Sequence, residues 1–119
     1  MLRTNFTQTS ADFGQAGLGE GVLKLTHILN APDEMNGAGR IFAHASLPVG
    51  AWVGPHEHKG ETEIYYYLSG RGEYYDNGKT VPVYPGCMTQ VLPGQQHGLK
   101  NTGDIPLEYI CLILYTKAD

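Results

Sequence analysis

The sequence predicts a single all-β domain, and three observations support this prediction. Short runs rich in β-branched and aromatic residues recur along the chain, with turn signals about every 8–12 residues. Glycine occurs 16 times, about twice its average usage, and so many glycines favour numerous tight turns. No stretch has the periodicity of a long helix. Together these features predict about eight or nine short strands, packed as a sandwich or a small barrel.

Length, charge and cysteine usage limit the classes of function. A chain of 119 residues fits one domain. A net charge of −4 with no cluster of Lys or Arg argues against nucleic acid or an anionic membrane as a partner. No apolar run approaches the ~20 residues of a membrane span, and the first residues lack the apolar core of a signal peptide. Cys87 and Cys111 are an isolated pair without metal-type spacing. A disulfide between them would be expected only in an exported protein, and nothing supports export, so we expect a cytoplasmic protein with reduced thiols.

The N-terminal segment differs in composition from the rest of the chain. Residues 1–21 are polar and rich in Gly, Gln and Thr, so we expect a loosely held arm followed by one domain over residues 22–119. The run AGLGEG at 16–21 has Val22 where a dinucleotide-binding loop needs its third Gly, and no helix pattern follows. We interpret this run as a turn.

Two strands are predicted before the first cluster of ionisable residues. Residues 22–29 are partly β-branched and predict a strand, and residues 30–39 carry turn signals that indicate a loop or one helical turn. Residues 40–47 alternate in polarity, which places Arg40 and His44 on one face. Period two does not say which face lies inside. The two side chains either reach an anionic ligand or orient a site within the barrel, or they lie on the outer surface.

The stretch from Gly50 to Gly70 holds ionisable side chains that can meet at one point. His56 and His58 lie two residues apart, and a strand sends such residues to the same face. A short polar segment that suits a turn follows, and Glu63 then begins an apolar return strand. His97 lies just after a Pro-Gly turn further along the chain. Three imidazoles and one carboxylate suit a divalent transition metal.

These residues form motifs that resemble those of the cupin superfamily. The first cupin motif, G-x5-H-x-H-x4-E-x6-G, is filled without a gap by Gly50, His56, His58, Glu63 and Gly70. The second motif, G-x5-P-x-G-x2-H-x3-N, is filled by Gly86, Gly94, His97 and Asn101, with Leu92 at the proline position and Pro93 one residue later. The short spacer over residues 71–85 is similar to that of small single-domain cupins.

The resemblance implies a fold, a ligand set and an assembly. The fold is a jelly-roll cupin barrel, also called a double-stranded β-helix. The ligands of one divalent transition metal ion are His56, His58, Glu63 and His97, and the candidate metals are Fe, Mn, Ni, Co and Zn. Small cupins of this kind are commonly homodimers. The last predicted strand, over residues 106–115, is nearly continuously apolar from Tyr109 onward, a pattern typical of a strand buried on both faces, either inside the barrel or under a dimer partner.

Two further segments complete the prediction. Tyr65 and Tyr67 share the face of Glu63 by alternation, so they either wall the pocket beside the metal or serve only as good strand formers. A hydroxyl in the pocket would hydrogen-bond a ligand or act as an acid. Residues 70–83 predict a hairpin with its turn at Asp76-Asn77-Gly78, and Pro82 indicates an edge strand or a bulge.

Three classes of function remain open, because one fold hosts many chemistries. The first is a metal-dependent dioxygenase of unknown substrate. The second is a redox-neutral isomerase, lyase or decarboxylase that acts on a small oxo- or hydroxy-acid or a sugar-like compound. The third is a non-catalytic module that binds a small molecule. An enzyme is favoured over a binding module, and the candidate catalytic residues are Arg40, His44, Tyr65 and Tyr67.

Overall fold

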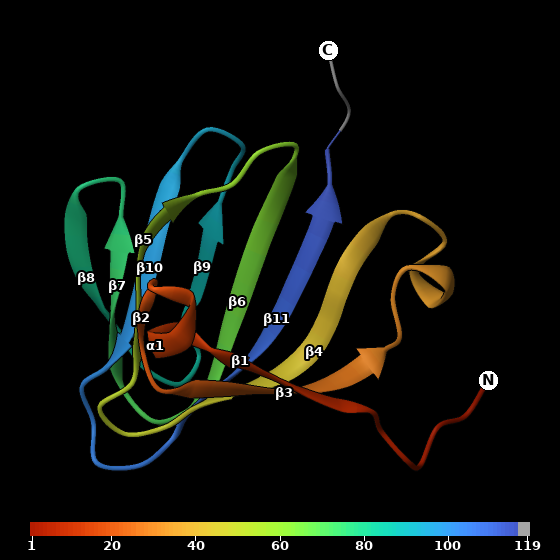
Figure 1. The fold of residues 1–119 in the computed structure, drawn as a ribbon, viewed down its shortest axis with the longest axis horizontal. Coiled ribbons are helices and arrows are strands. Elements are labelled where there is room, and N and C mark those ends of the chain that lie inside the picture. Colours follow the sequence, from red (N-terminus) through yellow and green to blue (C-terminus); the bar gives the residue numbers. More distant parts are fainter. Residues whose placement is uncertain (117–119) are drawn as a thin grey trace.

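Two antiparallel sheets face each other and enclose the core (Figure 1). The computed structural model describes residues 1–116, so the last three residues of the domain predicted over 22–119 lie outside the described part. One sheet has the order β1 (Gln8–Asp12), β3 (Val22–Leu29), β4 (Gly39–Leu47), β11 (Leu107–Tyr115), β6 (Glu61–Ser69) and β9 (Met88–Val91). The other has the order β2 (Gly19–Glu20), β5 (Trp52–Glu57), β10 (Gln96–Asn101), β7 (Gly72–Asp76) and β8 (Lys79–Val83).

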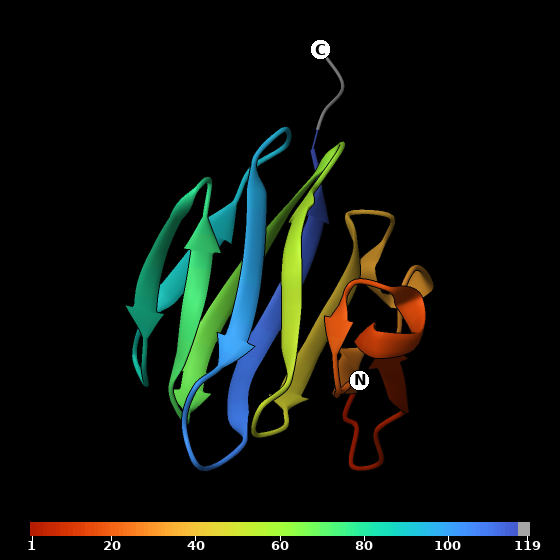
Figure 2. The same cartoon turned by 60° about the vertical axis from the view of Figure 1, so that its left-hand side comes forward.

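The all-β prediction is confirmed, and the architecture is the expected double-stranded β-helix (Figure 2). The helical segments of the described chain are one turn each, α1 (Phe13–Ala16) and η1 (Asp33–Met35). The latter lies where a loop or one helical turn was expected. The described chain has eleven strands, and the short N-terminal β1 and β2 account for the excess over the expected number.

The core lies between the inner faces of the sheets, where alternate residues of each strand are buried. On β11, Tyr109, Cys111 and Ile113 are buried, whereas the residues between them are only half-buried. This strand lies in the middle of its sheet, paired with β4 on one side and β6 on the other. The run was expected to be a strand buried on both faces, but within this chain only one face of β11 is buried inside the barrel, and the other forms an apolar outer face.

The structure shows which face of β4 lies inside the barrel, a question that the alternation of residues 40–47 left open. Ala43, Ala45 and Leu47 are fully buried between the sheets. His44 consequently lies on the other face, since successive side chains of a strand point to opposite sides, whereas the Arg40 side chain, at the start of the strand, reaches Glu61 at the edge of the cavity. Small apolar side chains therefore line the inner face of β4, and the polar side chain of His44 does not enter the packed core.

The N-terminal segment, expected as a loosely held arm, pairs with both sheets. Strand β1 pairs with β3 over the register from Gln8↔Thr26 to Asp12↔Val22, and β2 pairs with β5. Between them, the Asp12 carboxylate accepts a hydrogen bond from Gln15 N at 3.0 Å and caps α1. The polar composition of this segment did not indicate the pairing. Strand pairing is made by backbone hydrogen bonds, and the polarity of the side chains does not predict them.

The predicted hairpin of β7 and β8 is present, and its turn has the expected residues. Asn77 and Gly78 both have positive φ, at 48° and 94°, as a two-residue hairpin turn requires. Strand β8 is the edge of its sheet, which agrees with the position of Pro82.

Two other sequence features can be compared with the described residues. Cys87 and Cys111 are free thiols, and Cys111 is buried. Over residues 1–116, none of the helices has the length and apolar character needed to cross a membrane.

Candidate metal centre

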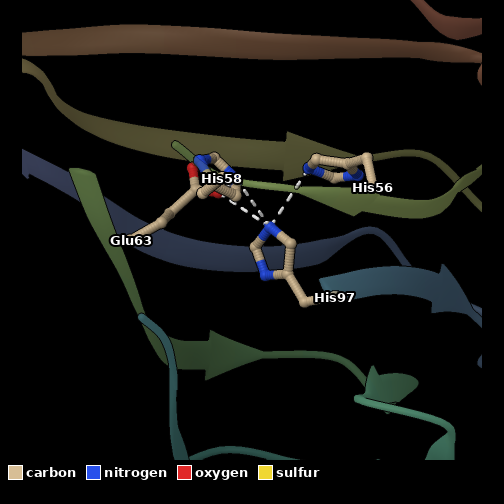
Figure 3. A group of neighbouring side chains, drawn as sticks. All are labelled: His56, His58, Glu63 and His97. Atoms are coloured by element: carbon tan, nitrogen blue, oxygen red, sulfur yellow. Dashed lines mark hydrogen bonds and ion pairs between the residues drawn. The ribbon is translucent and has the colours of Figure 1, made fainter. Parts of the chain in front are cut away.

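Four side chains from three neighbouring stretches converge inside the barrel (Figure 3). His56 lies on β5, His58 follows the end of that strand, and Glu63 lies on β6. His97 lies on β10 directly opposite His56 in the antiparallel register. The turn between β5 and β6 contains Gly60 at φ 70°, a conformation that Gly adopts without the usual steric cost. The prediction that these four side chains meet is confirmed.

The inner atoms of the cluster are close enough to share one ion. One potential ligand atom from each residue lies within 4.8 Å of all the others. The Nε2 atom of His97 lies 3.0 Å from Nε2 of His58 and 3.1 Å from Nε2 of His56. Glu63 Oε1 lies 3.0 Å from Nε2 of both His58 and His97. Only His56 is half-buried, and the other three are buried.

The ligand atoms of the cluster suit a cation, because the protons of His56 and His58 lie on the imidazole nitrogens that point away from the cluster. His56 Nδ1 donates to the Gly54 carbonyl at 2.9 Å, and His58 Nδ1 donates to Glu61 Oε1 at 2.9 Å. A neutral imidazole has one N–H, so both residues present an Nε2 lone pair inward. His97 has at most one proton to share between them. The neutral cluster therefore has more acceptors than donors, as a metal site requires.

The remaining ligands are also held from behind. The Tyr74 hydroxyl lies 2.9 Å from Nδ1 of His97, and the Cys111 thiol donates to Glu63 Oε2 at 3.1 Å. Glu61, which contacts His58, is itself bound by the Arg40 guanidinium through two hydrogen bonds of 2.8 Å. Such outer partners fix the orientation of metal ligands and tune their basicity.

The electrostatics favour an ionised carboxylate among the imidazoles. Burial raises the pKa of Glu63, but without a metal the contacts of its carboxylate with Nε2 of His58 and His97 outweigh burial when these nitrogens carry a proton, so the net pKa lies well below its usual range. The hydrogen bond with Glu63 raises the pKa of His58 against the effect of burial. Burial is the main cause that lowers the pKa of His56. Glu63 is therefore a carboxylate at neutral pH, ready to act as a ligand.

A cavity of about 340 Å³ opens onto the cluster. His56, His58 and Glu63 line it together with the rings of Tyr65 and Tyr109. Burial is the largest cause that raises the pKa of both tyrosines well above the usual value, and the nearby Glu63 carboxylate adds to it. Both phenols are therefore neutral hydrogen-bond donors beside the candidate metal site.

The structure separates the four residues considered for catalysis. Tyr65 lines the cavity, whereas the Tyr67 hydroxyl is bonded to Thr89 at 3.0 Å in the packed interior. Arg40 lies at the edge of the cavity, bound to Glu61. His44 lies on the outer face of β4, with Nε2 3.0 Å from the Glu108 carboxylate. The catalytic roles of these residues stay predictions.

Sequence reasoning missed several residues that support the site: Glu61, Tyr74, Tyr109 and Cys111. Each faces inward or toward a candidate ligand because of strand pairing, and the nearly continuous apolar run that contains Tyr109 and Cys111 shows no alternation in the sequence. Cys111 lies opposite Tyr65 in the register of β11 with β6, and neither residue alone indicates that neighbour. A local signal existed only for Glu61, which lies three residues after His58; in the structure it begins β6, two residues before the expected start of this strand at Glu63.

Comparisons with known proteins agree with the fold and the cluster. The family model of the Cupin domain matches residues 43–113. The chain is 41% identical over 96 residues to the oxalate-binding protein of Thermotoga maritima, covering 81% of this chain and 78% of that one. It is 32% identical over 80 residues to an uncharacterized protein of Methanocaldococcus jannaschii, covering 67% and 64% of the two chains.

Among solved structures, one from Thermotoga maritima described as a predicted oxalate decarboxylase superposes with a TM-score of 0.84. Its sequence identity is 36%, and the match covers 93% of this chain and 94% of that one. The family match covers more than half of the chain and contains the whole cluster of candidate ligands. The chain therefore belongs to the cupin family.

Proposed function

We propose that this protein binds one divalent transition metal ion through His56, His58, Glu63 and His97, and that the metal holds a small chelating carboxylate. The observation that carries the proposal is the convergence of these ligand atoms within 4.8 Å of one another at the wall of a cavity. Three nitrogens and one oxygen leave positions open on a six-coordinate ion, where two oxygens of a ligand fit.

The relatives support a carboxylate ligand over the dioxygenase that was the first expectation. One relative is named an oxalate-binding protein, and a similar structure is described as a predicted oxalate decarboxylase. Both descriptions belong to the redox-neutral and binding alternatives considered from the sequence. Oxalate and 2-oxo acids share a pair of oxygens on adjacent carbons. Such a pair can bind one metal ion as a chelate, with the two oxygens at neighbouring coordination positions.

The chain's own residues have defined tasks in this proposal. When bound, the metal acts as a Lewis acid that polarises the carboxylate or the adjacent carbonyl. Tyr65 and Tyr109 keep their protons at neutral pH and donate hydrogen bonds to ligand oxygens that turn toward the cavity. Tyr74 and Cys111 hold His97 and Glu63 in place from behind.

Titration calorimetry with oxalate tests the proposed function. Protein loaded with Mn(II) should bind about one oxalate per metal, and metal-free protein should bind none, since the metal supplies the contact. Succinate is the control ligand, because its carboxylates are too far apart to form the same small chelate ring. Equal binding of oxalate with and without metal would contradict the proposal.

A decarboxylase is the second candidate, favoured by a neutral phenol beside the site. Decarboxylation leaves a carbanion equivalent that must take up a proton, and the Tyr65 hydroxyl carries one in the cavity. We expect formate and CO₂ from oxalate, and a large loss of turnover in Tyr65→Phe with oxalate affinity within a few-fold of the original. Bound oxalate that is recovered unchanged would leave the binding function alone.

The proposal includes a homodimer formed through the outer face of the larger sheet. Adjacent strands place apolar side chains side by side there, since Ile110 pairs with Tyr66, and Leu112 pairs with Phe42 and Ile64. Tyr66 is 49% exposed. A second copy of this face would cover these side chains from water. Sedimentation that shows a monomer at micromolar concentration would contradict this part.

A further inference from the structure

The cavity beside the candidate metal site continues well beyond the metal ligands, along an apolar wall. This apolar wall consists of Phe13, Leu18, Leu23, Leu25, Ile41 and Val53. It comes mainly from the N-terminal part of the chain and from the strands that this part covers. The same cavity therefore has a polar end at the cluster and an apolar end.

The side chains of the apolar wall are exposed enough to contact a ligand. Phe13, Leu23, Leu25 and Val53 are only partly buried and pack with one side against the hydrophobic core. Leu18 is 49% exposed. Their remaining apolar surface faces the cavity, and a ligand that covers it gains the free energy of removing that surface from water.

Backbone hydrogen bonds hold the apolar wall in place. Phe13 N donates to Gly21 O at 3.0 Å, which closes the loop that contains α1. Gly54 N donates to Leu18 O at 2.7 Å, and Gly19 pairs with Val53. A rigid wall of this kind lowers the entropic cost of ligand binding, because few side chains must be ordered.

The size of the cavity exceeds what oxalate needs. A volume of about 340 Å³ lies within the range of roughly 300–1,000 Å³ that is typical of pockets for larger small molecules. Oxalate is the smallest dicarboxylate, and chelation would hold it entirely at the polar end. Most of the apolar wall would then face water.

The charges around the cavity do not favour a second free carboxylate. Two basic residues line it, Arg40 and Lys59, together with three acidic residues, Glu57, Glu61 and the candidate ligand Glu63. Arg40 donates both of its hydrogen bonds to Glu61, so this guanidinium is already neutralised. A ligand with one charged end and one apolar end suits such a lining better than a dianion does.

We propose that the preferred ligand is a 2-oxo carboxylate with an apolar alkyl or aryl substituent. This inference rests on the proposed function, since the carboxylate and the adjacent oxo group bind at the metal. The substituent lies against the apolar wall, where Leu18 and Val53 contact it. The N-terminal segment thereby determines specificity, although it contributes no metal ligand.

A series of 2-oxo acids of increasing chain length tests this inference. Pyruvate, 2-oxobutanoate and 4-methyl-2-oxopentanoate are titrated into Mn(II)-loaded protein by calorimetry, with oxalate measured in parallel. Each additional buried carbon should strengthen binding about fourfold, which gives roughly 60-fold for the three carbons that separate pyruvate from 4-methyl-2-oxopentanoate. Affinities that stay constant or fall along the series would overturn the inference.

Two variants locate the gain on the apolar wall. Val53→Thr keeps the shape of the side chain and adds a hydroxyl, and Leu18→Ser removes an exposed side chain that the fold does not bury. Both should lose several-fold in affinity for 4-methyl-2-oxopentanoate and keep their affinity for oxalate. Leu92→Ser is the matched control, since Leu92 is 46% exposed and does not line the cavity. Equal losses in Leu18→Ser and Leu92→Ser would also overturn the inference.

The parallel oxalate titration separates the two proposals. If oxalate binds to the metal-loaded protein and the 2-oxo acids show no gain with length, only the role of the apolar wall is wrong. If neither oxalate nor any 2-oxo acid binds to the metal-loaded protein, the proposed function itself is wrong, and the inference falls with it.

Discussion

The two ends of β10 each hold a buried polar side chain, and these two side chains differ in whether the protein supplies all of their hydrogen-bond partners. Asn101 lies at the packed end of this strand and is 2% exposed. Its amide nitrogen donates to the carbonyls of Leu47 and Ile105, both at 3.0 Å, and its oxygen accepts from Gly103 N at 2.9 Å. Every polar atom of this side chain thus has a partner within the protein, as buried amides generally do.

At the cavity end of the same strand, His97 is 1% exposed and its inner nitrogen faces two imidazoles and a carboxylate. These partners offer lone pairs in the form that binds metal, so the protein alone does not complete the arrangement. A buried polar group whose hydrogen bonds are all made within the protein stabilises the fold. A group of buried side chains that points several lone pairs at one place, without enough protons to pair them, forms a candidate metal site. The predictions below test this difference.

The largest effect is expected for His97→Ala. The substitution removes a ligand from the centre of the cluster, so the metal content of the purified protein should fall from near one ion per chain to a small fraction of that. Elemental analysis of protein purified without chelator measures it. His44→Ala is the matched control, because that imidazole lies on the outer face. Unchanged metal content in His97→Ala would show that the cluster is not the metal site.

Asn101→Leu tests the packed end. The change leaves the carbonyls of Leu47 and Ile105 without their donor, so the free energy of unfolding should fall by about 3 kcal/mol. Urea unfolding measures it, with Asn5→Leu at an exposed position as the control. The folded fraction should retain its metal. A loss of metal without a loss of stability would contradict the separation of the two ends.

Tyr74→Phe removes a hydroxyl behind the cavity end and leaves the ring in place. Because that hydroxyl contacts Nδ1 of His97, metal affinity should fall by roughly 10- to 100-fold. Competition with a chelator measures affinity, and the absorption spectrum of the Co(II) protein should shift as the imidazole changes orientation. Tyr75→Phe, on the next residue and facing the other way, should change neither quantity. Identical spectra for both variants would contradict a positioning role.

The smallest effect is expected for Arg40→Gln and depends on pH. The hydrogen bond from Arg40 is the main cause that lowers the pKa of Glu61. A carboxyl group with a lowered pKa adds stability above its unfolded pKa of about 4.5, and this stability disappears as the pH falls through its folded pKa. The variant should therefore unfold about 0.5 kcal/mol more easily at pH 7, as is usual for partly exposed ion pairs.

The difference between Arg40→Gln and the original protein should vanish in acid, as measured by urea unfolding at several pH values. Arg71→Gln, at another exposed arginine, serves as the control and should show no such dependence. A difference that grows as the pH falls would contradict the assignment, since protonated Glu61 no longer attracts the guanidinium.

The cluster of candidate ligands could be predicted because its determinants are local. His56 and His58 share a face through strand alternation, and Glu63 follows them across a short turn. The Asn77-Gly78 hairpin was predictable for a similar reason, since positive φ at both positions is favoured by these residue types. In each case a few adjacent residues determine the geometry.

Other parts of the site depend on which strands lie side by side, and that information is not local. Tyr65 and Tyr67 have the same alternation, yet only Tyr65 lines the cavity, because Tyr67 lies further along β6 beside Thr89. The N-terminal segment looked like an arm until its backbone pairing with β3 and β5 placed Leu18 and Phe13 over the cavity.

The sequence by itself determined the all-β class, the candidate metal ligands and the main turns, since alternation, residue type and turn conformation act over a few residues. Only the tertiary structure decided that Ala43 and not His44 faces inward, that Tyr74 and Cys111 support the ligands, and that an apolar wall extends the cavity. These features follow from the register and packing of strands that are distant in the chain. Which face of each strand is buried depends on its neighbours as well as on its own residues.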